Sequence, residues 1–179
     1  MIEQQSGSAR VDQSSAMRFI ATTDLPDAVP HFARLQHDEW RHLYPTWTVE
    51  NYAHELRTAS WDGELTESSH LAWFALDDHG TPVGVAMLLG TGELEPADEV
   101  ELLGPWFAGL VVEPASRSQG YGAGLLHHVM KQAAERGYHQ LRLVTEGGTG
   151  YYERHGWVVE RVVTLNSTPN TVMFTTVEI

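Results

Sequence analysis

The stretch Gln119-Gly120-Tyr121-Gly122-Ala123-Gly124 decides how the rest of the chain is interpreted. It follows the apolar run Leu110-Val111-Val112, which is typical of a strand, and it precedes residues 125–136, whose apolar positions recur every four residues as in a helix. The first N–H groups of a helix have no partner within the helix, and the helix dipole favours negative charge there. Glycines also let a ligand come close to the main chain. The stretch therefore predicts a binding site for a phosphorylated ligand.

Length and composition indicate one folded domain. Of the 179 residues, 42% are hydrophobic, which is enough for a core. We expect a flexible polar extension at residues 1–15 and a single domain at residues 16–179. No apolar run is long enough to span a membrane, and the first residues do not resemble a signal peptide. The sequence has no cysteine, which excludes disulfides and thiolate metal sites and fits a cytoplasmic location.

The net charge of −13 bears on possible partners. A surface of this charge repels nucleic acid and anionic membranes, so both are excluded as expected partners. It attracts small cations and basic segments, although an acidic surface also serves solubility alone.

Periodicity and turn signals predict a mixed α/β sheet with helices on both faces. The predicted helices lie at residues 25–42, 48–59, 119–136 and 151–155, and Gln36 is the polar exception on the apolar face of the first. The predicted strands lie at residues 17–21, 71–76, 82–89, 106–112, 141–145, 157–165 and 171–179. Turns are expected at Asp77–Gly80 and around Pro169–Asn170, and an acidic surface loop at residues 91–104. Strands 106–112 and 141–145 flank the long helix and should be parallel with a right-handed crossover.

Two other phosphate-binding motifs fit the glycine stretch poorly. A Walker loop ends in Gly-Lys-Ser/Thr, and this stretch contains no lysine. A dinucleotide fingerprint places its first glycine directly after the strand and an acidic residue about twenty positions later. Here residues 113–119 separate the strand from Gly120, and the later position holds Gln140-Leu141-Arg142.

The segment Arg117–Gly122 fits the pattern Arg/Gln-x-x-Gly-x-Gly/Ala. With Val112-Glu113-Pro114 before it and Gly124-Leu125-Leu126 after it, it resembles the acyl-coenzyme A motif of the GNAT superfamily of N-acyltransferases. The segment Tyr151–Trp157 resembles the second signature of that family, and the spacing between the two leaves room for a helix and a strand. The resemblance implies a mostly antiparallel sheet with one splayed parallel strand pair. The structural alternative is that the glycines only let a helix pack closely against a strand.

The resemblance implies acetyl-CoA as a cosubstrate and no metal. The expected contacts with the diphosphate are main-chain N–H groups and one nearby cation; the residues are Arg117, Gln119, Gly120, Tyr121, Gly122, Ala123 and Gly124. The pantetheine arm is expected to bind like an added strand along Leu110, Val111 and Val112, with an N–H near Val112 directed at the thioester oxygen.

Direct attack of an amine on a thioester requires an acid for the thiolate and a base for the ammonium. Tyr152 matches the family tyrosine that protonates the thiolate, although either Tyr151 or Tyr152 should face the core. The strand at residues 106–112 lacks the glutamate that some family members carry there, so Glu101 is the expected base, with Glu113 and Glu146 as alternatives. A water chain and an acceptor that binds already neutral are two further alternatives. The histidines form no metal-ligand pattern.

These observations predict an N-acetyltransferase that acts on a primary amine of a small molecule or peptide. The acidic surface favours a cationic acceptor, and the aromatic residues Trp40, Tyr44 and Trp47 are expected near it. A CoA-binding sensor without turnover is the main alternative, and a nucleotide-dependent enzyme is a weaker one. Dimers are common among proteins of this resemblance, so a homodimer stays open, although the sequence shows no self-complementary patch.

Overall fold

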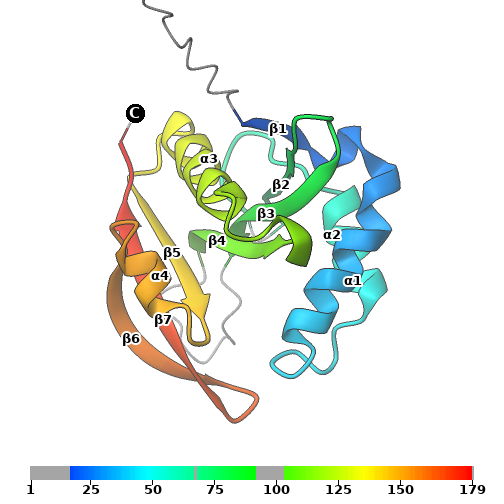
Figure 1. Cartoon of the computed structure of the whole chain (residues 1–179). Helices are drawn as coiled ribbons and strands as arrows, with labels where there is room; N and C mark the ends of the chain where they lie inside the picture. The colour runs from blue at the N-terminus through cyan, green and yellow to red at the C-terminus, as the bar shows by residue number, and fades with distance from the viewer. Residues whose placement is uncertain (1–16, 67, 92–102, 179) are drawn as a thin grey trace, which may run out of the picture.

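The computed structural model describes residues 17–66, 68–91 and 103–178. In this part of the chain, strands form one sheet in the order β1-β2-β3-β4-β5-β7-β6 (Figure 1). Their bounds are β1 Arg18–Ala21, β2 His70–Leu76, β3 Pro82–Thr91, β4 Leu103–Val112, β5 Gln140–Thr145, β6 Val158–Leu165 and β7 Thr168–Thr176. Neighbouring strands are antiparallel except β4 and β5, which are parallel. The predicted mixed sheet with one parallel pair is confirmed.

Two parts of the sequence prediction lie outside the described residues. These are the N-terminal extension at residues 1–15 and the expected base Glu101, together with most of the acidic loop predicted at residues 91–104.

Local sequence signals explain where α1 and α2 begin. Their bounds are η1 Thr22–Asp24, η2 Pro26–Ala28, α1 Val29–Trp40, α2 Val49–Arg57, η3 Pro114–Ser116, α3 Tyr121–Glu135 and α4 Thr149–Glu153. The helix predicted from residue 25 starts four residues later as α1, with Pro30 in its first turn, where a missing N–H costs no hydrogen bond. At α2, Thr48 and Asn51 form a capping box.

The helices cover both faces of the sheet, as the sequence predicts. Alternation along β2 shows the division: Ala72 and Phe74 pack with α1 and α2, whereas Trp73 and Ala75 pack with α3. Successive side chains of a strand point to opposite faces, so a strand that is buried on both faces becomes apolar throughout.

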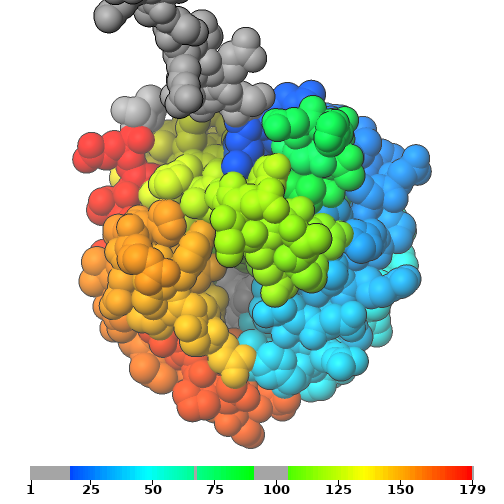
Figure 2. Space-filling view, in the orientation of Figure 1, coloured from blue at the N-terminus to red at the C-terminus, as the bar shows by residue number. Residues whose placement is uncertain are grey.

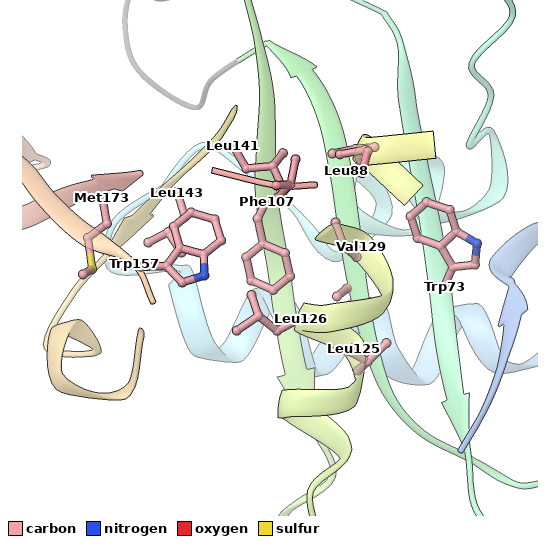
Figure 3. Close-up of a cluster of buried hydrophobic side chains, with 14 of the residues drawn as sticks. Trp73, Leu88, Phe107, Leu125, Leu126, Val129, Leu141, Leu143, Trp157 and Met173 are labelled. Atoms are coloured by element: carbon pink, nitrogen blue, oxygen red, sulfur yellow. The ribbon is translucent and has the colours of Figure 1, made fainter. Parts of the chain in front are cut away.

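The core on the α3 face packs α3 and the Trp157 ring against β4. Leu125, Leu126 and Val129 of α3 point toward Phe107 and the neighbouring strands in Figure 3. All three side chains are fully buried. The ring of Trp157, the last residue of the predicted second signature, lies 6.2 Å from the Phe107 ring. This packing holds α3 and the residue that follows α4 against the middle of β4.

The β6–β7 turn differs from the prediction. It was expected around Pro169–Asn170, but both residues lie in β7, where Pro169 is opposite Thr164. The turn consists of Asn166 and Ser167, whose φ values are 42° and 65°. Two consecutive residues with positive φ match the right-handed twist of a two-residue hairpin. Proline is tolerated at its position because β5 pairs with β7 only from Thr171 onward.

The predicted turn between β2 and β3 is present, and Asp77 stabilises it. Its Oδ1 accepts hydrogen bonds from the main-chain N–H groups of His79 at 2.9 Å and Thr81 at 2.8 Å. The hydrogen bond from Thr81 is the main cause that holds the pKa of Asp77 below its ordinary value of 3.8. The stabilisation is therefore present above about pH 3.8 and is lost as the pH falls through the lower pKa of the folded state.

We expect Asp77→Ala to lower the melting temperature at neutral pH by about 2–4 °C, the shift typical of one lost interaction in a chain of this size. The difference from wild type should shrink as the pH falls below 3.8, because protonation weakens the same acceptor in the wild type. Thermal unfolding at several pH values measures this, with the exposed neighbour substitution Asp78→Ala as the control. An unchanged difference at low pH would contradict the role of the carboxylate.

Candidate active site

A cleft separates the two parallel strands. β4 and β5 pair where Trp106 lies opposite Arg142, and beyond this pair lies a cavity of about 260 Å³. Figure 2 shows its opening as a hollow between the yellow-orange atoms of β5 and α4 and the blue atoms of α1. The cavity is lined by Glu39, Trp40, His42, Leu43, Tyr44, Phe107, Ala108, Gly109, Leu110, Leu143, Val144, Thr145, Glu146, Gly148, Tyr151, Tyr152 and Asn170.

A bulge in β4 shapes the wall of this cleft. The register with β3 shifts between Val85 and Met87, and Gly109 opposite this shift has a φ of +66°. The segment that lines the cleft is Phe107–Leu110, so only Leu110 of the predicted pantetheine segment lines the cavity itself. Val111 and Val112 continue β4 toward the glycine turn. A glycine inside an apolar strand is a signal for a bulge, and the sequence prediction overlooked it.

The glycine turn begins α3 as predicted. Gly120 is the N-cap residue with a φ of +91°, so the first N–H groups of α3, those of Tyr121, Gly122 and Ala123, point out of the helix end without intrahelical partners. Gly124 differs, because its N–H donates to the Gly120 carbonyl at 2.9 Å. A Cβ at Gly124 would collide with the side chain of Met17, so this glycine allows close packing of the chain before β1.

Side-chain hydrogen bonds fix the loop before the turn. Arg117 Nε donates to the Val112 carbonyl at 3.1 Å, and Gln119 Nε2 donates to the Ala115 carbonyl at 3.1 Å. The guanidinium of Arg117 is thereby held at the end of β4.

Both adjacent tyrosines line the cleft, but their surroundings differ. The Tyr152 ring packs edge-on against Phe107 and Trp157, at centroid distances of 6.2 and 6.0 Å. The Tyr151 hydroxyl is buried, has no hydrogen-bond partner among the described residues, and would lie 3.3 Å from a Cβ at Gly122. Burial raises the pKa of Tyr151, which keeps its hydroxyl protonated. From the sequence, one of the two tyrosines is expected to pack in the core. The pattern did not indicate that the Tyr151 hydroxyl faces the start of α3.

The alternative bases Glu113 and Glu146 each pair with a histidine from the α1 region. Glu113 Oε1 contacts His31 Nε2. Glu146 Oε2 lies 2.6 Å from His42 Nε2, and both residues line the cleft. Of these two carboxylates, Glu146 is therefore the one that the fold brings to the cavity.

A larger cavity of about 1050 Å³ adjoins the cleft. The two cavities share Trp40, Leu43, Tyr44, Ala108 and Gly109, so they meet at the bulge. The described side chains that line the larger one include five aromatic residues and three carboxylates but no lysine or arginine; they are Trp40, Tyr44, Trp47, Tyr52, Trp61, Glu55, Asp62 and Glu64. All three aromatic residues that the sequence placed near an acceptor are among them.

Among the described residues, no group of three or more histidine, aspartate or glutamate side chains is arranged to hold a metal ion. No helix in the same residues is long and apolar enough to cross a membrane.

Comparisons with known proteins agree with this geometry. The model of the acetyltransferase (GNAT) family matches residues 32–157. An aminoglycoside 6′-N-acetyltransferase in complex with coenzyme A is 19% identical with a TM-score of 0.61, and covers 86% of this chain and 91% of its own. An aminoglycoside 6′-acetyltransferase type Ii is 19% identical with a TM-score of 0.64, over 89% and 97% of the two chains.

A more distant sequence has the same fold. A spermidine N-acetyltransferase chimera from Vibrio cholerae and hSSAT is 12% identical with a TM-score of 0.64, over 90% of this chain and 96% of its own. No curated protein sequence matches the chain significantly. Because the family model matches well over half of the sequence, the chain belongs to the GNAT family of acetyltransferases.

Proposed function

We propose that the protein transfers an acetyl group from acetyl-CoA to a primary amine of a small cationic molecule. The observation that carries the proposal is the junction at Ala108 and Gly109, where the cleft between β4 and β5 meets the larger cavity. A donor in the cleft and an acceptor in the cavity would place thioester and amine side by side. Holding two reactants in this way removes much of the entropic cost of their encounter.

The start of α3 supports binding of the coenzyme. The outward N–H groups of Tyr121, Gly122 and Ala123 would hold the diphosphate, with Gln119, Gly120 and Arg117 completing the loop. Gly124 contributes through packing, since its N–H is engaged by Gly120. The pantetheine arm would run along Leu110, Val111 and Val112, and a main-chain N–H near Val112 would stabilise the developing oxyanion.

The chemical step balances with two proton transfers. The amine nitrogen attacks the thioester carbon, a C–N bond forms and the C–S bond breaks. A base takes one proton from the nitrogen, and an acid gives one to the thiolate of coenzyme A. Tyr152, which matches the motif position and lines the cleft, is the proposed acid. Glu146 with its partner His42 is the proposed base among the described carboxylates, since both line the same cleft.

The lining of the larger cavity supports a small cationic acceptor. Its volume lies at the upper end of the range for small-molecule sites. Its described walls carry the carboxylates Glu55, Asp62 and Glu64 and the aromatic rings of Trp47 and Tyr52, which favour cations through charge and cation–π contacts. Two proteins of the same fold are named for acetylation of aminoglycosides and spermidine, which are cationic small amines.

The proposal is tested by thiol release from acetyl-CoA in the presence of putrescine, spermidine, tyramine or kanamycin, with mass spectrometry of the amines. We expect a product heavier by one acetyl group and one equivalent of free thiol. Binding of coenzyme A without turnover of any amine would favour the sensor alternative instead. If the protein does not bind coenzyme A at all, both the acetyltransferase proposal and the sensor alternative are wrong.

A further inference from the structure

Gln36 is a polar residue in an apolar environment. It lies on the face of α1 that carries the buried residues Val29, Phe32 and Ala33, and its own side chain is fully buried. A side-chain amide has two donor hydrogens and an acceptor oxygen, and burying it without partners costs free energy. A hydrophobic residue would satisfy the helix pattern at this position, so the amide requires another explanation.

One end of this amide is hydrogen-bonded and the other is not. Gln36 Nε2 donates to the Gly109 carbonyl at 2.9 Å. Because a carbonyl only accepts hydrogen bonds, this contact fixes the orientation of the amide and leaves Oε1 as the remaining acceptor. Oε1 is buried and has no hydrogen-bond partner among the described residues. A Cβ at Gly109 would lie 2.8 Å from Nε2, so the close approach depends on the glycine of the bulge.

Gln36, which carries this unpartnered oxygen, lies beside the residues where the two cavities meet. Gln36 lines the larger cavity beside Ala108 and Gly109, and these two residues also line the cleft. Oε1 is covered in this structure, so a ligand that pairs with it has to displace the side chains packed over it. Since Oε1 only accepts, the ligand group that pairs with it must be a donor such as N–H or O–H.

We infer that Gln36 Oε1 accepts a hydrogen bond from the acceptor amine and orients its nitrogen for attack. The inference rests on the proposed function. A neutral primary amine carries two hydrogens: one leaves to the base during acyl transfer, and the other stays on the nitrogen of the product amide. The N–H that stays is the one that donates a hydrogen bond to Oε1. The bond strengthens as the attacking nitrogen becomes positive, so it favours the transition state over the bound substrate.

This mechanism distinguishes primary from secondary amines. An amine that is methylated on the acetylated nitrogen loses its single hydrogen to the base, so Oε1 is left without a partner. We expect wild type to prefer the primary amine by at least about 10-fold in kcat/KM over its N-methyl form. Gln36→Met keeps the size of the side chain and removes the acceptor. In this variant the preference should fall about 10-fold, down to the steric effect of the methyl group alone.

The experiment uses the best acceptor from the amine panel and its derivative methylated on the acetylated nitrogen; for putrescine this is the derivative methylated on both nitrogens. Gln140→Met, the same substitution at an exposed position outside both cavities, is the matched control and should keep the wild-type preference. Gln36→Leu is a second variant in case Gln36→Met does not fold. The wild-type preference alone tests the inference if neither folds.

The outcomes separate the inference from the proposed function. If wild type acetylates no amine, the proposed function fails and the inference fails with it. If wild type is active but Gln36→Met keeps the preference for the primary amine, only the inference fails. If Gln36→Met raises KM for acetyl-CoA and lowers the melting temperature but keeps the preference for the primary amine, the role of Gln36 is to support the bulge in β4. Equal use of both amines by wild type would also overturn the inference.

Discussion

Tyr152→Phe is expected to lower kcat by about 10²–10³-fold, because the thiolate of coenzyme A would then leave without a proton donor. The ring of Tyr152 should keep its packing against Phe107 and Trp157, since the substitution removes only the hydroxyl. KM for acetyl-CoA and the melting temperature should therefore change little. Steady-state kinetics of thiol release, together with thermal unfolding, measure all three quantities.

Tyr151→Phe is the matched control for this prediction, because it removes the same hydroxyl from the adjacent residue. The Tyr151 hydroxyl faces the start of α3. Its removal should lower kcat by less than about 10-fold, which is below the usual range for loss of a general acid. If Tyr151→Phe abolishes turnover while Tyr152→Phe remains active, the proton donor is Tyr151 and the motif-based assignment is wrong.

A second large effect is expected from Ala123→Asp at the start of α3. An acidic residue in the first turn interacts favourably with the helix dipole, so the variant should be as stable as wild type or slightly more stable. The same charge would repel the phosphates of coenzyme A. Each phosphate charge at roughly 8 Å costs about 2 kcal/mol at an effective dielectric constant near 20, so after screening we expect about 100-fold weaker binding. Calorimetric titration with coenzyme A measures it.

Ala123→Asn is the control, because it has the same shape as aspartate without the charge. It should bind coenzyme A within a few-fold of wild type, and added salt should partly restore binding to Ala123→Asp. Acetyl-pantetheine, which lacks the diphosphate, should react equally with both variants. Equal losses in the two variants would show that size rather than charge matters at residue 123, and unchanged binding in both would place the diphosphate elsewhere.

Features governed by a few neighbouring residues could be predicted from the sequence. The glycine turn before α3, the cap at Thr48 and the turn after Asp77 all depend on dihedral preferences or hydrogen bonds within a few positions. The β6–β7 turn was misplaced because proline and asparagine are typical turn residues. Pairing of the two strands instead placed Asn166 and Ser167 at the tip.

The sequence by itself determined the family, the order of helices and strands, and the end of α3 that faces the proposed diphosphate, because these depend on motifs and periodicity read along the chain. Only the tertiary structure decided which residues meet in the site. Gln36 and Gly109 are 73 positions apart, and His42 and Glu146 are 104 apart. Such pairs arise from sheet register, the bulge in β4 and the docking of α1. Packing of the whole core sets these, and no local sequence pattern encodes them.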